Sequence, residues 1–224
     1  MYKRPTMKKY YFFDLDGTLT DPALGITNSF KHAFVHFGLE IPSYEKLCTF
    51  IGPPLVDTFK NELHFDDAKA AEGVKAYREY FSTKGIFENK VYDGIPELLK
   101  NLKEKGKVLV VATSKPEEFA VKIIEHFGLS EYFEHVCGSC MDETRSTKAE
   151  VISYALDLCG IDEAHKEQVL MIGDRKHDII GAKANGIESC GILFGYGSRE
   201  ELETAGADYI AESVAAIAKL SDKI

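Results

Sequence analysis

The feature that most constrains the fold of this chain is a series of short apolar runs that alternate with helical patterns. The central runs are apolar at successive positions, as expected for strands covered on both faces. One helical pattern with i, i+3, i+4, i+7 spacing is formed by Ile95, Leu98, Leu99 and Leu102. Strand–helix alternation indicates a parallel sheet with right-handed crossovers, so we predict an α/β, Rossmann-like sheet flanked by helices. The predicted strands are Tyr10–Phe13, Lys107–Thr113, His135–Ser139, Val169–Asp174, Ser189–Phe194 and Asp208–Ala211.

One interval, from about Pro22 to Asn89, contains no convincing strand. It carries apolar helical stripes instead, and the segment "IGPPL" (Ile51–Leu55) interrupts them because two consecutive prolines cannot continue a helix. We therefore predict a small helical domain, residues 22–87, inserted into a core domain made of residues 1–21 and 88–224.

Charge and hydropathy exclude several classes of partner. The formal net charge of −9 disfavours binding to nucleic acid or to an anionic membrane. No apolar run approaches the roughly 18 residues of a membrane-spanning helix. The basic start, "MYKRPTMKK", is followed by an apolar run that Asp14 cuts short, so it does not resemble a secretory signal. A cytoplasmic protein, monomeric or a small homo-oligomer, is the expectation.

The five cysteines include one close pair, Cys137 and Cys140 in "CGSC". A CxxC pair is compatible with redox chemistry or zinc binding, but a tetrahedral zinc site needs four ligands and no second pair exists. Two reduced thiols just past a short strand are the favoured interpretation.

Acidic residues follow two of the predicted strands. Asp14 and Asp16 end the first, and residues two apart in a strand point to the same face. Asp174 ends another strand, and Asp178 follows one helical turn later. Because ligands of open α/β sheets bind beyond the carboxyl ends of the strands, we expect these four carboxylates to converge.

Two lysines fall near the same edge. Ser114–Glu117 and Thr147–Glu150 both fit the S/T-x-x-E capping box, which would place Lys115 and Lys148 in first helical turns. The helix dipole disfavours a cation there, so two such lysines suggest a bound anion. The acids form an oxygen-rich, histidine-poor set that suits Mg²⁺, which takes carboxylates, carbonyls, waters and a substrate phosphate.

Together, "DLDGTLTDP", the strand-terminal Thr113, Lys148 and "GDRKHD" resemble the four ordered motifs of the haloacid dehalogenase (HAD) superfamily. The helical insert resembles the type-1 cap domain of that superfamily. "IGPPL" and "VVATSKPEEFA" are most similar to its phosphoglycolate phosphatase branch, which grades into 5′-nucleotidase-like members.

The resemblance implies a role for each acid. Asp14 is expected to attack phosphorus and form an aspartyl-phosphate, and Asp16 to protonate the leaving alcohol and then accept a proton from water. Mg²⁺ is expected between Asp14, the backbone carbonyl of Asp16 and Asp174. Asp178 is expected to orient Lys148 or a metal-bound water.

The resemblance also implies a phosphate site. Thr113 and the N–H of Ser114 are expected to bind phosphoryl oxygens, with Lys148 balancing their charge. Gly17 is expected to allow a sharp turn directly after the acids. In the insert, Gly52 and Pro53 are expected to shape the lid of the substrate pocket, although "IGPPL" can also be read as a simple helix break.

Structural roles stay open for single residues. Thr113 can be an ordinary strand-end residue, Lys148 a solvated charge and Asp178 a helix N-terminal acid favoured by the dipole. No role is assigned to the remaining charged residues near the motifs or on the insert: Lys115, Arg175, Lys176, His177, Arg78 and Lys84.

The resulting hypothesis is a Mg²⁺-dependent phosphatase that hydrolyses a small phosphorylated metabolite. The presence of Asp16 separates it from dehalogenases of this fold, whose halide leaves without a proton. The motifs do not separate it from a sugar phosphomutase with the same aspartyl-phosphate. A phospho-accepting signalling module is a third reading, although receiver domains are about half this length and lack a helical insert. Phosphoglycolate, a nucleoside monophosphate and a sugar phosphate all fit as substrates.

Overall fold

The computed structural model describes residues 7–142 and 144–224, so the first six residues of the basic start lie outside it. The chain forms two compact units. One combines the residues up to Thr20 with Val91–Ile224, and the other is Asp21–Lys90.

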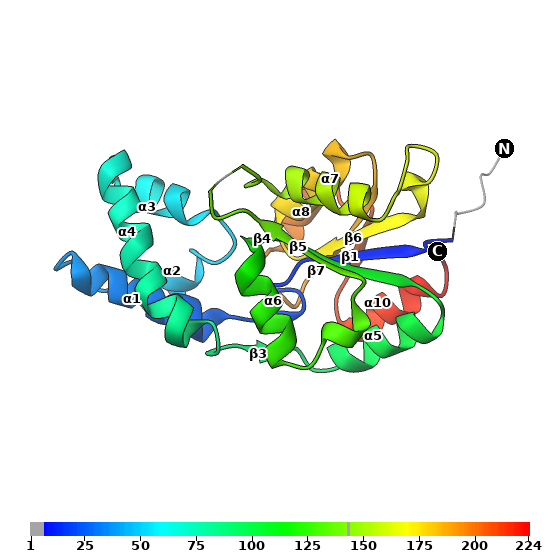
Figure 1. Cartoon of the computed structure of the whole chain (residues 1–224), viewed down its shortest axis with the longest axis horizontal. Coiled ribbons are helices and arrows are strands. Elements are labelled where there is room, and N and C mark those ends of the chain that lie inside the picture. The colour runs from blue at the N-terminus through cyan, green and yellow to red at the C-terminus, as the bar shows by residue number, and fades with distance from the viewer. Residues whose placement is uncertain (1–6, 143) are drawn as a thin grey trace. The chain divides into compact units, whose positions relative to one another are not determined.

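The first unit is built on a six-stranded parallel sheet with strand order β5-β4-β1-β6-β7-β8 (Figure 1). All six predicted strands are present, within a few residues of their expected ends. β1 lies between β4 and β6, with Phe13 opposite Val111 on one side and Ile172 on the other. The chain therefore builds the sheet outward in two directions from β1, which makes its carboxyl end a topological switch point. The strands are β1 (Tyr10–Phe13), β4 (Val108–Pro116), β5 (His135–Ser139), β6 (Val169–Gly173), β7 (Glu188–Ile192) and β8 (Tyr209–Ala211).

Helices cover both faces of this sheet (Figure 1). α7 and α8 lie on one face, where Val151 and Ile152 pack with Phe12, Val110 and other apolar strand residues. α5, α6 and α10 lie on the other, and α9 packs beside α8. Burial on both faces explains why the strands are apolar throughout rather than alternating. The helices are α5 (Ile95–Glu104), α6 (Glu117–His126), α7 (Lys148–Leu158), α8 (Lys176–Ala184), α9 (Arg199–Ala205) and α10 (Val214–Ser221), with 3₁₀ turns at Ser130–Tyr132 and Lys166–Gln168.

The second unit, Asp21–Lys90, is helical, with an aromatic core centred on Phe30. The ring of Phe30 lies 5.1 Å from Phe50, 5.7 Å from Phe59 and 5.0 Å from Tyr77. The "IGPPL" segment ends one helix before the next begins, as the two prolines predict. Its elements are α1 (Ala23–His36), α2 (Tyr44–Cys48), α3 (Leu55–Leu63), α4 (Asp67–Tyr80) and a π-helical turn, Phe81–Gly85.

The two stretches where the chain passes between the units, β2 (Thr20–Asp21) and β3 (Lys90–Val91), form a separate two-stranded sheet. Lys90 Nζ lies 3.3 Å from Asp21 Oδ2, so the two ends of the inserted segment meet. That this insert acts as a cap domain stays a prediction.

Cys137 and Cys140 are both free thiols. Cys137 belongs to the apolar cluster between the sheet and α7, and its burial raises the pKa of the thiol to about 12. Among the described residues, no helix is both long and apolar enough to cross a bilayer.

Candidate active site

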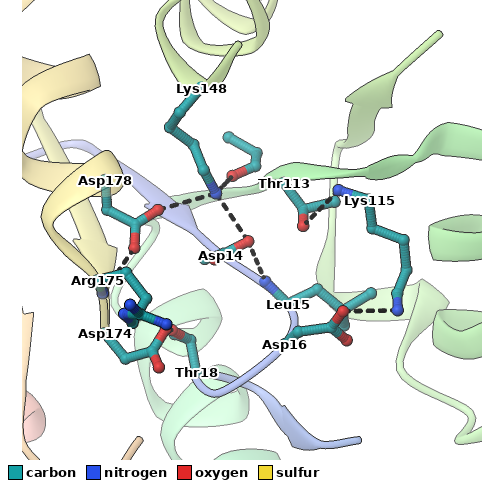
Figure 2. A network of polar contacts seen from close by, with 11 residues as sticks. Asp14, Leu15, Asp16, Thr18, Thr113, Lys115, Lys148, Asp174, Arg175 and Asp178 are labelled. Carbon is teal, nitrogen blue, oxygen red and sulfur yellow. Dashed lines mark hydrogen bonds and ion pairs between the residues drawn. The ribbon is translucent and has the colours of Figure 1, made fainter. Parts of the chain in front are cut away.

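The carboxyl ends of β1, β4 and β6 meet at one edge of the sheet and bring the polar motifs together (Figure 2). Asp14 follows β1 directly, and its N–H donates to Ile172 O of β6 at 2.9 Å. Asp174 follows β6 directly, and Thr113 lies near the end of β4. The parallel register therefore places residues that are about 100 and 160 positions from Asp14 in the sequence beside it.

Asp14 is buried and its carboxylate is fixed by two donors. Oδ1 accepts the N–H of Leu15 at 2.8 Å and lies 2.8 Å from Lys148 Nζ. Both contacts use the same oxygen, which leaves Oδ2 outside them.

Lys148 is the first residue of α7, and a capping box formed by Thr147 and Glu150 fixes the start of that helix. Its Nζ contacts three acceptors: Asp14 Oδ1 and Asp178 Oδ1, each at 2.8 Å, and Ala112 O at 3.1 Å. Burial alone would lower the pKa of Lys148, but the two carboxylates hold it above its ordinary value. Lys148 is thus a buried side chain held between two carboxylates rather than a solvated charge.

Asp178 combines two of the roles considered for it. Its Oδ2 accepts the N–H of Arg175 at 3.0 Å, which is the contact of a helix N-terminal acid. Its Oδ1 binds Lys148. Burial raises its pKa to about 6, although Lys148 acts in the opposite direction.

Asp174 is fully buried and surrounded by like charge. Burial raises its pKa well above the ordinary value, and the nearby Asp178 and Asp14 raise it further. The N–H of Tyr196 donates to Oδ2 at 2.8 Å, and the Thr18 hydroxyl lies 3.5 Å from Oδ1. These donors are neutral, and the Arg175 guanidinium lowers the pKa of Asp174 by less than burial and the two carboxylates raise it, so an ionised Asp174 needs further positive charge.

These acids fit a divalent cation. Oxygens of Asp14, Asp174 and Asp178 lie within 4.8 Å of one another and are buried. Carboxylate oxygens are the ligands of hard cations such as Mg²⁺, and a cation would relieve the repulsion that raises the pKa of Asp174. Asp178 pairs with Lys148 through Oδ1 and accepts the N–H of Arg175 through Oδ2, and the resemblance to the family implies Asp14 and Asp174 as the carboxylate ligands. Asp16 lies outside this side-chain cluster, and binding of a cation through its backbone carbonyl stays a prediction.

Asp16 has a different cation as its partner. Lys115 Nζ lies 2.6 Å from Asp16 Oδ2 (Figure 2). Burial raises the pKa of Asp16, and Lys115 opposes that shift. Each acid of the DLD motif therefore has its own lysine: Lys148 contacts Asp14, and Lys115 contacts Asp16.

The predicted capping box at Ser114 is wrong. β4 continues through Pro116 and α6 begins at Glu117, so Lys115 is a strand residue and not part of a first helical turn. The pairing of β4 with β5 shifts register between Ala112 and Pro116, and this irregularity turns the end of the strand. The Thr113 hydroxyl accepts the N–H of Lys115 at 3.3 Å, and Ser114 lies half-buried between them.

Glycines let the backbone approach Asp174. Gly17 has φ +80°, and a Cβ there would lie 2.2 Å from Asp174 Oδ2. Sequence reasoning expected the sharp turn at Gly17 but missed the loop after β7. A Cβ on Gly195 would lie 2.4 Å from Asp174 Cβ, and one on Gly197 would lie 1.9 Å from Asp174 O. The Gly-Tyr-Gly sequence after the predicted strand Ser189–Phe194 marks a loop, but it does not reveal that this loop meets Asp174.

Other residues considered from the sequence lie elsewhere. The Arg175 side chain pairs with Glu201, with Nε 2.9 Å from Oε1. Gly52 and Pro53 lie between α2 and α3 of the second unit, and their role in a substrate pocket stays a prediction.

The sequence of the chain matches a known family. A model of the haloacid dehalogenase-like hydrolases matches residues 11–192, so the chain belongs to that family. The resemblance drawn from the four ordered motifs is confirmed, together with the α/β fold class and the phosphatase class of enzyme.

Individual relatives are similar over nearly the whole chain. A 5′-nucleotidase of Pseudomonas aeruginosa is 45% identical over 205 residues, which cover 92% of this chain and 91% of that protein. The tyrosine-protein kinase PtkA of Mycobacterium tuberculosis is 37% identical over 201 residues, 90% of this chain and 67% of that protein. The crystal structure of a predicted phosphatase from Clostridium acetobutylicum is 46% identical, with a TM-score of 0.93 over 98% of this chain and 100% of that one.

Proposed function

We propose that this protein is a Mg²⁺-dependent phosphatase that hydrolyses a small soluble phosphate monoester through an aspartyl-phosphate on Asp14. One observation carries the proposal: two neighbouring acids lie at a switch point of the sheet, each held by a separate lysine. This arrangement gives the two carboxylates different surroundings, which is what a nucleophile and an acid–base pair require.

In the first step, an oxygen of Asp14 attacks phosphorus and the bond from phosphorus to the ester oxygen breaks. The electron pair of that bond stays on the ester oxygen, which takes the proton of Asp16 and leaves as an alcohol. Lys148 holds Oδ1 of Asp14 in place for this attack. In the second step, water attacks the phosphorus of the aspartyl-phosphate while Asp16 takes its proton. The phosphorus–Asp14 bond then breaks, and inorganic phosphate leaves.

The phosphoryl oxygens are expected to bind Thr113, the N–H of Ser114 and the ammonium of Lys148, which together supply hydrogen bonds and positive charge where negative charge is concentrated. Asp178 keeps Lys148 at this position through the 2.8 Å contact to Nζ. Mg²⁺ would be held by Asp14, Asp174 and the backbone carbonyl of Asp16, and when bound it offsets the repulsion between a carboxylate nucleophile and a phosphate dianion.

The substrate class is supported by the relative named 5′-nucleotidase, so a nucleoside monophosphate is the first candidate, ahead of phosphoglycolate and sugar phosphates. Selection among these is expected to lie in the insert, around Gly52 and Pro53. We expect the protein to act on soluble metabolites in the cytoplasm.

The test is the release of inorganic phosphate from p-nitrophenyl phosphate, with Mg²⁺ and with EDTA. The Asp14→Asn variant should lose at least about 10³-fold in kcat, as removal of a nucleophile does elsewhere. Asp162→Asn, which changes an exposed acid after α7, should behave as wild type. Equal activity of Asp14→Asn and wild type would refute the proposal.

A sugar phosphomutase remains the alternative enzyme, because it would use the same two acids. A sugar phosphate that is isomerised without release of inorganic phosphate would support the mutase and contradict the hydrolase.

A further inference from the structure

Lys115 contacts Asp16 although none of the four motifs includes it. Its Nζ lies 2.6 Å from Asp16 Oδ2, and the two side chains are only 7% and 17% exposed. An ion pair with so little access to water is screened weakly, so it holds a more definite geometry than a surface pair.

The backbone of Lys115 is held by the turned end of β4. Its N–H donates to the Thr113 hydroxyl, and its carbonyl lies against β5, where a Cβ on Gly138 would be 2.6 Å from Lys115 O. Glu117 braces the same place, because its Oε2 accepts the N–H of Gly138 at 3.1 Å and the Arg145 guanidinium at 2.7 Å. Lys115 is therefore presented to Asp16 from a fixed strand end and not from a free loop.

Lys148 cannot take over the contact that Lys115 makes with Asp16. An ammonium has three donors, and those of Lys148 are directed to Asp14, Asp178 and Ala112 O. Lys148 thus contacts Asp14 and Asp178, and Lys115 contacts Asp16.

The contact with Lys115 gives the two carboxylate oxygens of Asp16 different surroundings. Lys115 binds Oδ2, whereas Oδ1 is buried and has no hydrogen-bond partner in the part of the chain that the structure describes. A buried carboxylate oxygen without a donor is costly, and such groups in folded proteins call for an explanation.

We propose that Lys115 is a positioning residue for Asp16: it anchors Oδ2 and leaves Oδ1 as the oxygen that exchanges a proton with the ester or with water. This rests on the proposed function, in which Asp16 is the acid–base group. The alternative is that Lys115 only neutralises a buried charge and has no influence on proton transfer.

The two possibilities predict different effects of the leaving group on the activity of a Lys115 variant. Phenyl phosphate and p-nitrophenyl phosphate have nearly the same shape, but phenolate is much the more basic leaving group and depends more on a proton from Asp16. Loss of positioning should therefore affect phenyl phosphate selectively. The quantity to compare is kcat/KM, because it covers the steps up to the first phosphoryl transfer and is independent of the later hydrolysis.

The experiment measures kcat/KM of wild type and Lys115→Met on both esters. We expect a decrease of about 10–100-fold for phenyl phosphate, the range below full loss of a general acid, and of less than about 3-fold for p-nitrophenyl phosphate. Lys8→Met is the matched control: it also removes a buried lysine, which pairs with Glu188 at the opposite ends of the strands. It should leave the ratio of the two esters unchanged.

A double-mutant cycle with Asp16→Asn completes the test. In that background, Lys115→Met should cause no further change in the ratio of the two esters. Equal decreases on both esters, an unchanged ratio, or the same change in both backgrounds would overturn the proposal. If Lys115→Met has no cooperative thermal transition, Lys115→Gln takes its place, with a smaller change in the ratio expected and no change again overturning the proposal. Failure of the proposed function would differ, because Asp14→Asn would then retain activity on both esters.

Discussion

At the scale of single residues, the site contains buried carboxylates whose ionised forms are unfavourable until a cation binds. Asp174 illustrates this most clearly, because it is fully buried beside two other carboxylates, whose effect the Arg175 guanidinium offsets only in part. Desolvation and like charge both disfavour its ionised form.

Replacement of Asp174 by Asn should consequently stabilise the metal-free protein or leave its stability unchanged, while activity is lost. The folded-state pKa of Asp174 is raised, so at pH values above the pKa of an ordinary aspartate the cost of ionising Asp174 destabilises the fold. Asn cannot ionise, so the variant does not carry this cost. Thermal melts with Mg²⁺ and with EDTA check this. Mg²⁺ should raise the Tm of wild type by mass action and leave the Tm of Asp174→Asn unchanged. An equal Mg²⁺-dependent shift in both proteins would contradict the assignment of this ligand.

Gly17 provides a second residue-scale prediction. Gly17→Ala should cost about 1–2 kcal/mol for the left-handed backbone and should also displace the Asp174 carboxylate and lower kcat. Gly106→Ala is the matched control, since Gly106 also has positive φ but a Cβ there meets nothing within 4 Å. The control should lose similar backbone stability, measured by urea unfolding, and retain full activity. Equal effects on kcat would show that the close approach to Asp174 is unimportant.

At the scale of elements, the beginnings of helices decide where the charged groups lie. Lys148 depends on the first turn of α7, and Asp178 depends on the first turn of α8. Each of these charged residues lies in the first turn of its helix. A small change in the backbone of that turn therefore moves a buried charge.

Thr147→Ala tests this dependence. It removes the cap of α7, which should cost about 0.5–2 kcal/mol, and it should lower kcat because Lys148 is the next residue. Ser213→Ala removes the corresponding cap of α10, whose hydroxyl accepts the N–H of Ala216. It should lose comparable stability in urea unfolding with no change in kcat. If Thr147→Ala and Ser213→Ala have the same kcat, the cap of α7 does not determine the position of Lys148, and the prediction is wrong.

The contact between α8 and α9 predicts a pH dependence of stability. Burial tends to raise the pKa of Glu201, but the N–H of Lys176 and the Arg175 guanidinium prevail and lower it below 4.5. A lowered folded-state pKa means that Glu201 stabilises the fold above the unfolded value and loses this effect as the pH falls through the folded one. Urea midpoints should therefore be lower for Glu201→Gln than for wild type at neutral pH, and the two should converge well below pH 4.5. Glu125→Gln, on the exposed face of α6, should follow wild type throughout; a constant gap for Glu201→Gln would refute the prediction.

At the scale of the whole molecule, chemistry and selection are predicted to reside in separate units. Asp14, Asp16, Thr113, Lys148, Asp174 and Asp178 all belong to the first unit, and the second is inserted between the paired strands β2 and β3. Because its two ends meet, the insert can be removed without stretching the chain.

Replacement of residues 22–89 by a glycine linker of about four residues, a common hairpin length, should therefore leave a folded first unit. This variant should still release phosphate from p-nitrophenyl phosphate with Mg²⁺, but it should lose the ranking among nucleoside, sugar and glycolate phosphates. Circular dichroism checks the fold, and kcat/KM over the ester panel checks the ranking. A folded variant that keeps the wild-type ranking would place selectivity in the first unit instead.

Much of this arrangement could be predicted from the sequence for a physical reason. Strands buried on both faces are apolar without interruption, so β1, β4 and β6 are visible in the sequence, and the residues that follow them share one edge. The position of Lys115 could not be predicted, because a local S-x-x-E pattern competes with the tertiary pairing of β4 and β5, and the pairing prevails. The approach of Gly195 and Gly197 to Asp174 depends equally on three-dimensional packing, which no local pattern records.

Because Asp14 and Asp16 pair with separate lysines, the two pairs can change independently in evolution. Lys115 and Asp16 form one pair and Lys148 and Asp14 another, so mutation can remove the first pair while the second persists. A descendant whose leaving group needs no proton would lose the use of Asp16, and Lys115 would then be a buried cation without a counter-charge. Positions 16 and 115 should therefore vary together among related chains, and independently of positions 14 and 148.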